Sequence, residues 1–338
     1  MRWFRNQFFW ASVFCLALPN GNAKQNTTDS PLISIEGAAQ GTSYHIKYRD
    51  WQKRNYKAQI DSILADIDKC LSLYRPDSEI AAFNRSDSHS FLSPYFYPVL
   101  KKSAEAYQAT EGAFDPTVLP LVEAYRLGKK QRRDWAEKTD SLLQYVGFQY
   151  IHFDSVSVQK RKANVRLDFD SIAQGYTVDV IAAFLETRGI TRYMVEVGGE
   201  VVCRGEKSAG KWWMIGIENP TRPGELQTAI QMTNRAMATS GNYRNQYQVH
   251  GQTFSHIINP KTGFSAPDSL LSVTVFASNA LTADAFDTAF LVMGLEKTKA
   301  FLATRSDLDA YLIYRDRLGN MKVFFTEGIR PFIGHQQD

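Results

Sequence analysis

Asp284 and Thr288 are two oxygen-bearing side chains placed four residues apart, at the start of an apolar run that continues to Gly294. On a helix, positions four apart lie on one face, so this carboxylate and this hydroxyl would point in the same direction. Two hard oxygen ligands, completed by water and phosphate oxygens, suit Mg²⁺ better than a soft metal. Taken alone, the pair is more typical of an ordinary helix whose first turn carries an acidic residue.

His256 is the second residue with chemical potential, because it lies among apolar residues just before the rigid turn at Asn259-Pro260. A histidine titrates near neutral pH and can serve as a general base. A histidine in apolar surroundings is nevertheless more often a hydrogen-bonded residue of the core. None of the five other histidines has comparable surroundings.

Three further segments could bind a ligand. Residues 240–243 (Ser-Gly-Asn-Tyr) predict a turn whose backbone amides could receive a phosphate or a carbonyl. The paired glycines of residues 197–200 (Val-Gly-Gly-Glu) indicate a bulge in a strand or the close approach of a flat ligand. Asp168 precedes a predicted turn at residues 172–175, where a main-chain carbonyl could face a cation.

Several well-defined cofactor and catalytic motifs do not occur in the sequence. The dinucleotide fingerprint GxGxxG and the phosphate-binding loop GxxxxGK[ST] are missing. So are the nucleophile elbow of the serine hydrolases and the HExxH and CxxC patterns of zinc sites. These absences count against a Rossmann cofactor site, a P-loop nucleotidase, a serine hydrolase and a zinc enzyme.

The N-terminus has the pattern of an export signal. Arg2 and Arg5 precede an apolar run over residues 8–18, which is followed by Gly21-Asn22-Ala23. We predict a signal peptide at residues 1–23, cleaved after Ala23, and a flexible mature terminus at residues 24–32. Lipidation at Cys15 is the alternative, but the bulky Phe14 stands where a small residue is expected. The apolar run is too short to span a membrane.

Composition limits the remaining possibilities. The 338 residues are 44% hydrophobic, which is enough for a packed core in one large or two medium domains. The net charge is only +4, and the one basic cluster, at residues 129–133, predicts a solvated face and no nucleic-acid site. Cys70 and Cys203 lie in apolar surroundings, so we interpret them as small core residues and not as a disulfide framework.

The pattern of apolar residues predicts an α+β protein. Helices are predicted at residues 56–71 and 94–110, along Tyr176, Val180 and Phe184 up to Gly189, and from residue 284 onward. Strands are predicted at residues 33–48, 193–202, 211–218, 226–233, 236–239 and 270–277, with a closing hairpin at 310–314 and 321–325. Strands outnumber helices and follow one another without regular βαβ alternation, which favours α+β over a doubly wound fold. We expect residues 33–330 to form one unit of two lobes.

In their order along the chain, these segments resemble the ApbE-like FAD:protein FMN transferases. The resemblance covers residues 33–327, and its pieces are residues 41–44, 74–84, 113–118, 168–179, 197–200, 239–243, 255–263 and 284–294. It implies transfer of the FMN part of FAD, through a phosphoester, to a Thr or Ser hydroxyl of an exported or membrane redox subunit, with release of AMP. The acceptors of this family carry a motif of the type Asp-x-Ser/Thr-Gly-Ala-Ser/Thr.

The resemblance also implies a two-lobed fold with mostly antiparallel sheets, flanking helices and FAD in the cleft between the lobes. It implies Mg²⁺ as cofactor, held by Asp284, Thr288 and the main-chain carbonyl of Ala173. The flavin nucleotide would lie along Gln40, Tyr74, Ala113, Phe114, Asp115, Asp168, Gln174 and Ile258. We add Ser240, Gly241, Asn242 and Tyr243 to this set for their backbone amides and for the Tyr243 ring.

The expected chemistry agrees with these residue types. FAD's pyrophosphate repels an oxygen nucleophile, so a cation and amide donors must offset its charge. A Thr hydroxyl needs a base, for which His256 matches the family's catalytic histidine and Asp287 is the second candidate. Tyr74 and Tyr243 would flank the isoalloxazine ring. At position 174, Gln replaces the Lys or Glu of many members, which predicts altered affinity.

Two other functions remain open on the sequence alone. The same metal site could support an FAD pyrophosphatase that uses water as the nucleophile and yields FMN and AMP. A flavin-binding protein without turnover is the alternative from a different class, because a fold does not guarantee a chemistry. In each case we expect an exported protein, in the periplasm or at the periplasm-facing inner membrane. Only the less favoured alternative, a lipid anchor at Cys15, would attach it to the membrane.

Overall fold

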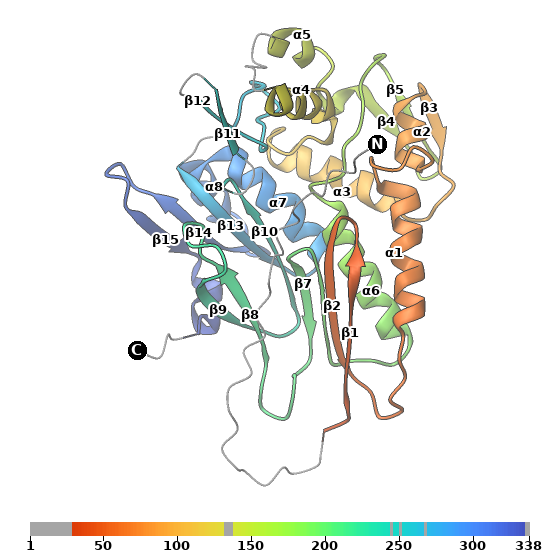
Figure 1. The fold of residues 1–338 in the computed structure, drawn as a ribbon, viewed down its shortest axis with the longest axis vertical. Coiled ribbons are helices and arrows are strands. Elements are labelled where there is room, and N and C mark those ends of the chain that lie inside the picture. The colour runs from red at the N-terminus through yellow and green to blue at the C-terminus, as the bar shows by residue number, and fades with distance from the viewer. Residues whose placement is uncertain (1–28, 132–137, 244–245, 250–251, 267–268, 335–338) are drawn as a thin grey trace.

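A computed structural model describes residues 29–131, 138–243, 246–249, 252–266 and 269–334. Its helices are α1 Lys57–Leu71, α2 Glu79–Asn84, α3 Phe96–Ala109, α4 Leu119–Gln131, α5 Thr139–Leu143, α6 Ala173–Thr187, α7 Ala280–Met293 and α8 Leu295–Leu302 (Figure 1). The predicted signal peptide and Cys15 lie outside the described residues. Within the described part of the chain, no helix combines the length and the apolar character needed to cross a membrane.

The molecule is organised around one large antiparallel sheet. Its strands, in spatial order, are β1 Leu32–Ala39, β2 Thr42–Arg49, β6 Tyr193–Val197, β7 Glu200–Arg204, β10 Arg235–Gly241, β13 Leu270–Ala277, β14 Asp309–Arg315 and β15 Met321–Phe325. Three smaller sheets consist of β3 Ser88–Ser90 with β5 Ser157–Lys160 and β4 Ile151–Phe153, β8 Trp213–Glu218 with β9 Leu226–Met232, and β11 Gln246–Val249 with β12 Gln252–Ser255. Every pair in the large sheet is antiparallel, which confirms the predicted α+β class.

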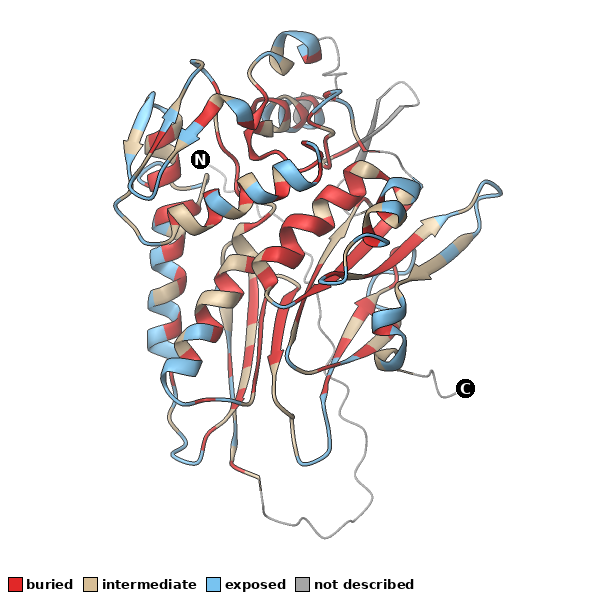
Figure 2. Ribbon diagram, turned by 180° about the vertical axis from the view of Figure 1, so that it is seen from behind, coloured by how far each residue is buried: buried red, intermediate tan, exposed pale blue. Residues whose placement is uncertain are grey.

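Both faces of the large sheet are covered. The side chains of a strand alternate between the two faces, so Val195 packs under α6 while Met194, its neighbour, contacts the opposite cluster. Helices α6 and α7 cover the first face, and the β8–β9 hairpin covers the second (Figure 1). This is why all eight residues of β13 are buried. Buried residues accordingly concentrate along the central strands and the helices packed on them (Figure 2).

A second group of elements, α1 to α5 with the β3–β5–β4 sheet, lies beside the large sheet (Figure 1). Its core is aromatic: Phe83, Phe96 and Phe169 pack edge to face with ring centroids 5.5–6.3 Å apart. Helix α7 joins the two parts, because its residues Ala285 and Ala289 belong to this core while Phe286 and Phe290 belong to the core under the sheet. The helix that carries Asp284 is therefore fixed from two sides.

Glycine allows α6 and α7 to approach closely. A Cβ atom on Gly175 would lie 2.4 Å from the carbonyl oxygen of Ala280 and 2.7 Å from the Cβ of Asp284. No side chain fits in that space, so the start of α6 is pressed against the second turn of α7. The contact brings the segment 168–175 next to Asp284.

Three local predictions were wrong. Helix α7 begins at Ala280, where the Asn279 side chain accepts a hydrogen bond from Thr282 N, so Asp284 is buried in the second turn and is not an acid of the first turn. Residues 240 and 241 belong to β10, paired with β13, and do not form a turn. Gly198 and Gly199 form the tight turn of the β6–β7 hairpin, with φ of 68° and 113°, and not a bulge within a strand.

Other predictions are confirmed or refined. Helices α1 and α3 and the β14–β15 hairpin lie within two residues of the predicted bounds. The strand predicted at residues 33–48 is two strands, joined by a turn at Gln40 and Gly41 with φ of 53° and 72°. Cys70 and Cys203 are both buried and free. Of the predicted flexible terminus, Asp29 accepts hydrogen bonds from Arg192 and Ala209, which tie this end to the sheet edge.

Candidate active site

A cleft of about 520 Å³ opens where β7 and β10 meet helices α4, α6 and α7. The segments that line it are far apart in the sequence, from residue 74 to residue 288. The predicted site residues on its walls are Tyr74, Asp168, Gln174, Ser240, Gly241, Tyr243, His256, Ile258, Asp284 and Thr288. The fold therefore brings most of the predicted metal, base and nucleotide residues around one cavity.

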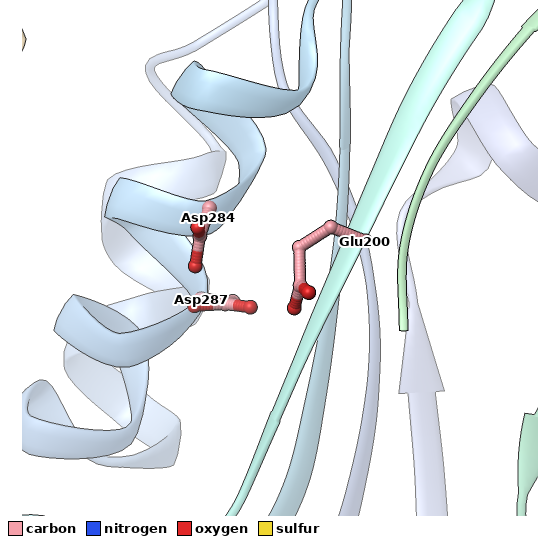
Figure 3. Close-up of side chains that lie close together, drawn as sticks. All are labelled: Glu200, Asp284 and Asp287. Atoms are coloured by element: carbon pink, nitrogen blue, oxygen red, sulfur yellow. The ribbon is translucent and has the colours of Figure 1, made fainter. Parts of the chain in front are cut away.

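Three buried carboxylates meet on one side of this cleft: Glu200, Asp284 and Asp287 (Figure 3). Glu200 opens β7, and the two aspartates lie three apart on α7. One oxygen from each residue lies within 4.8 Å of the other two. Burial raises the pKa of Asp284 to about 7, and burial together with the charges of Asp284 and Glu200 raises the pKa of Asp287 well above its ordinary value.

Hydrogen bonds fix the two aspartates. The backbone N–H of Gly175 donates to Asp284 Oδ2 over 2.8 Å, across the close α6–α7 contact. The Ser240 hydroxyl donates to Asp287 Oδ1 over 3.1 Å and lies 3.0 Å from Thr288 Oγ1. Asp287 Oδ2 is buried and has no hydrogen-bond partner. An oxygen-only donor set of concentrated negative charge, with one orphaned carboxylate oxygen, fits a hard divalent cation.

His256 lies on a loop that is closed upon itself. Ala266 N donates to Ile257 O and Asn259 N donates to Phe264 O, each over 2.8 Å. Ile257 and Ile258 are buried, and they anchor the loop while His256 faces the cleft. The geometry places an imidazole at a fixed position in the same cavity as the carboxylates, as a general base requires.

The mouth of the cleft is framed by Tyr74, Arg126 and Asp170. Arg126 Nη2 donates to Tyr74 Oη over 3.0 Å and to Asp170 Oδ2 over 3.1 Å. The guanidinium also lies 5.5 Å from the centre of the Tyr74 ring. Deeper in, Asp168 accepts a hydrogen bond from Asp170 N, and burial raises its pKa to about 7. Tyr74 is thus an exposed but oriented aromatic wall.

The remaining predicted residues lie behind these walls. Gln40 donates to Thr177 Oγ1 over 2.8 Å, and Thr177 in turn donates to the carbonyl of Ala173 at the start of α6. Asp115 is buried at the start of the short helix Pro116–Val118, where it accepts hydrogen bonds from Thr117 and Phe148.

Ala113, Phe114 and Asn242 are also buried behind the cleft walls. Ala113 and Phe114 are core residues. The Asn242 side chain accepts a hydrogen bond from Ser255, next to His256. These contacts hold the segments from which the walls are built.

The family follows from comparison with known proteins. The sequence model of the ApbE family matches residues 40–312. The chain belongs to the ApbE family. It is 34% identical to the FAD:protein FMN transferase of Haemophilus influenzae, over 85% of this chain and 88% of that protein. The identity to the Escherichia coli K12 transferase is 33%, over 96% of this chain and 95% of that protein.

Solved ApbE structures share the fold. The flavin transferase ApbE of Vibrio cholerae matches with a TM-score of 0.79 and 30% identity, covering 90% of this chain and 99% of that one. The apo flavinyl transferase ApbE of Pseudomonas stutzeri matches with a TM-score of 0.80 and 28% identity, covering 91% and 98%. The predicted resemblance and the α+β fold are thereby confirmed.

Several residues that line the cleft of this ApbE protein are not predicted from the sequence. Glu200 directly follows the paired glycines, and an acid in that position is the signal that could have identified it. Arg126 and Lys129, on α4, line the cleft. The basic run that begins at Lys129 is predicted to face solvent. A single sequence contains no signal that Lys129 faces the cleft instead.

Proposed function

We propose that this ApbE protein transfers the FMN part of FAD to a Thr or Ser hydroxyl of an acceptor protein and releases AMP. The observation that carries the proposal is the convergence, in one cleft, of His256 with the Asp284–Thr288 pair and an aromatic wall at Tyr74. An acid–alcohol pair, an imidazole and an aromatic surface are the groups that metal-assisted transfer of a flavin phosphate requires. The relatives named as FAD:protein FMN transferases support the same activity.

The cation of this reaction is proposed to be Mg²⁺, held by Asp284, Thr288 and the carbonyl of Ala173. When bound, it would offset the negative charge of the FAD pyrophosphate and make the FMN phosphorus more open to attack. The packing of α6 against α7 supports this assignment, because Gly175 N already binds Asp284 Oδ2 two residues beyond Ala173. The all-oxygen donor set matches the preference of Mg²⁺.

The other wall residues bind and orient the nucleotide. Gln174, Ser240 and the backbone of Gly241 offer neutral hydrogen-bond donors to phosphate and flavin oxygens. Tyr74 and Tyr243 offer flat apolar surfaces for the isoalloxazine ring, and Tyr243 Oη is oriented by a 3.3 Å hydrogen bond to Glu218.

His256 is proposed as the general base. Its imidazole removes the proton of the acceptor hydroxyl as the hydroxyl oxygen forms a bond to the FMN phosphorus. The bond between that phosphorus and the bridging oxygen breaks, and AMP leaves with the electron pair. His256 is favoured over Asp287 because His256 lines the cleft, whereas Asp287 is buried behind Ser240 and Thr288.

The acceptor and the cellular location are further parts of the proposal. We expect the acceptor to be a redox subunit with an Asp-x-Ser/Thr-Gly-Ala-Ser/Thr type motif, outside the cytoplasm. The N-terminal pattern of residues 1–23 supports export to the periplasm or to the periplasmic side of the inner membrane. The mass of the mature N-terminus distinguishes cleavage after Ala23 from a lipid anchor at Cys15.

AMP release from FAD tests the proposed activity. With Mg²⁺ and an acceptor peptide that carries the motif, we expect AMP to appear and free FMN to stay low. A peptide with the motif's Ser and Thr changed to Ala should suppress AMP release. Release of FMN and AMP at the same rate without any acceptor would identify a pyrophosphatase instead, and unchanged FAD under all conditions would identify a binding protein.

A further inference from the structure

The three carboxylates at the β7–α7 contact form a denser negative cluster than the proposed magnesium ligands require. Glu200 and Asp287 are not part of the Asp284, Thr288 and Ala173 set. They are 5% and 1% exposed, and one oxygen of each residue lies within 4.8 Å of the other and of Asp284. Holding several negative charges so close together in a buried site is unfavourable without a compensating positive charge.

The state of the individual oxygens shows where that charge is needed. Asp284 Oδ2 and Asp287 Oδ1 each accept one hydrogen bond, from Gly175 N and from Ser240 Oγ. Asp287 Oδ2 is buried and accepts none. Figure 3 shows the Asp287 side chain extending from α7 toward Glu200 on β7. A buried carboxylate oxygen without a partner is unfavourable, so Asp287 Oδ2 is suited to bind a ligand.

The positive charge is not supplied to the two aspartates by the described side chains. Among the described residues, neither Asp284 nor Asp287 forms an ion pair with a lysine or an arginine, and neither residue type is among the main influences on their pKa values. Arg126, at the mouth of the same cleft, is engaged by Asp170 and Tyr74. A divalent cation from solution would supply positive charge to the two aspartates.

We infer that Glu200 and Asp287 extend the metal-binding residues into a site that takes up a divalent cation before any nucleotide binds. This inference rests on the proposed function in one respect: the cation is taken to be the same ion that the transferase reaction uses. An acid and an alcohol alone present one negative charge, so their cation would depend on the FAD phosphates for binding. Three carboxylates can hold Mg²⁺ or Mn²⁺ by themselves, and their charge discriminates against monovalent ions.

The hairpin turn explains how Glu200 reaches this position. Gly198 and Gly199 turn the chain between β6 and β7, and the Glu196 carboxylate accepts a hydrogen bond from Gly199 N over 2.9 Å. Glu200 is the first residue after the turn and pairs with Val197. This short, fixed segment places the Glu200 side chain against α7. A carboxylate that binds a metal needs such a fixed position.

Binding of Mn²⁺ to the FAD-free protein tests this inference. We expect the full mature chain to bind Mn²⁺, measured by the loss of the free-ion electron paramagnetic resonance signal, and to release it on addition of Mg²⁺. The variant Glu200→Gln keeps the size of the side chain and should weaken Mn²⁺ binding by at least about tenfold. Glu296→Gln, at an exposed position on α8, is the matched control and should bind as the wild type does.

Thermal unfolding of the same proteins keeps the test independent of activity. Without metal, Glu200→Gln should be at least as stable as the wild type, because one of three repelling charges is removed. Added Mg²⁺ without FAD should raise the melting temperature of the wild type and of Glu296→Gln, and much less that of Glu200→Gln. Equal rises in all three proteins, or tight Mn²⁺ binding by Glu200→Gln, would overturn the inference.

The outcomes separate this inference from the proposed function. A wild type that transfers FMN but binds no Mn²⁺ in the absence of FAD refutes the early-binding cation site and leaves the transferase activity standing. A wild type that binds Mn²⁺ without FAD, yet transfers no FMN under any condition, retains the cation site and refutes the proposed function.

Discussion

Asp284 shows how one residue depends on its surroundings for a chemical role. On a solvated helix surface, a carboxylate of this kind would be an ordinary charged side chain. Here it is 5% exposed, receives the N–H of Gly175, and lies against two other carboxylates. The proposed cation would offset the free energy needed to bury these charges, which is why this aspartate is suited to bind a metal.

Asp284→Ala should abolish FMN transfer while leaving the fold intact. The substitution removes the ligand that the proposal requires, and it also removes one charge from a crowded cluster, so the melting temperature without metal should not fall steeply. The initial rate of AMP release and the thermal unfolding curve together check this. Glu296→Ala is the control for loss of an exposed carboxylate, and a normal turnover in Asp284→Ala would show that the metal assignment is mistaken.

His256→Ala should slow transfer by about 10²- to 10⁴-fold, the usual contribution of a general base. FAD affinity should change little, because the imidazole acts on the acceptor hydroxyl. Single-turnover rates and FAD binding, measured on the same protein, separate the two effects. His152→Ala, an exposed histidine on β4, is the control; an unaltered rate in His256→Ala would move the base elsewhere, with Asp287 as the next candidate.

Residues of the site could be predicted where local spacing or the family resemblance indicates them. The i, i+4 relation of Asp284 and Thr288 is visible in any sequence. Glu200 reaches the same cluster through the pairing of β6 with β7 and the packing of α7, and nothing near position 200 indicates that partner. Arg126 likewise acquires its role only when α4 lies across Tyr74 and Asp170.

At the scale of elements, the site depends on two tightly packed connections, the α6–α7 contact and the β6–β7 turn. The α6–α7 approach at Gly175 sets the distance between the segment 168–175 and Asp284. The β6–β7 turn, fixed through Glu196, sets the position of Glu200. Both contacts join elements that are distant in the sequence, so an error in either one displaces residues on both sides of the cleft.

Gly175→Ala should impair both stability and activity. The new Cβ would meet the Ala280 carbonyl at 2.4 Å, and backbone cannot move aside as a side chain can, so the helices must separate. Overpacking of this kind costs typically about 1–3 kcal/mol. Denaturant unfolding and the transfer rate check this, with Ala183→Ser on the exposed side of α6 as the control; a fully active, equally stable Gly175→Ala would show that the close contact is not required.

The β2–β6 contact should respond to pH. His45 Nδ1 lies 2.7 Å from Glu196 Oε2, and this hydrogen bond raises the pKa of His45, with Glu36 across the strand pair adding to the effect and Lys47 opposing it. Because the folded-state pKa is raised, the stabilisation is fully present below the ordinary histidine pKa of about 6.5 and is lost as pH rises through the folded value.

The difference in unfolding free energy between the wild type and His45→Gln measures this contribution. It should be largest near pH 6 and shrink at alkaline pH. A difference that stays constant, or grows, as pH rises would contradict the assignment of a charged His45–Glu196 pair.

At the scale of the whole molecule, the fold class could be predicted because it rests on repeated local patterns. Alternating apolar residues located most strands of the sheet, and apolar spacing located α1 and α3. The predicted start of α7, at Asp284, was wrong, because the helix is capped by Asn279 and Asp284 lies one turn further along it. The order of strands in the sheet, which places β7 beside β10 and both beside α7, depends on long-range packing that a single sequence does not display.

The complete cleft therefore belongs to the assembled molecule. Residues from β7, β10, α4, α6, α7 and the His256 loop meet only when the second group of helices packs beside the large sheet. We expect this cavity to bind FAD and a cation on its walls and to admit an acceptor hydroxyl next to His256. The hydroxyl of another protein then becomes bonded to FMN.

The intact mass of an acceptor peptide tests that claim most directly. After incubation with this protein, FAD and Mg²⁺, a peptide that carries the Asp-x-Ser/Thr-Gly-Ala-Ser/Thr type motif should gain the mass of one FMN less one water. Fragmentation should place the added mass on a hydroxyl residue of the motif. An acceptor that keeps its original mass under every divalent metal tried, whether FAD stays intact or is cleaved to FMN and AMP, would contradict the account.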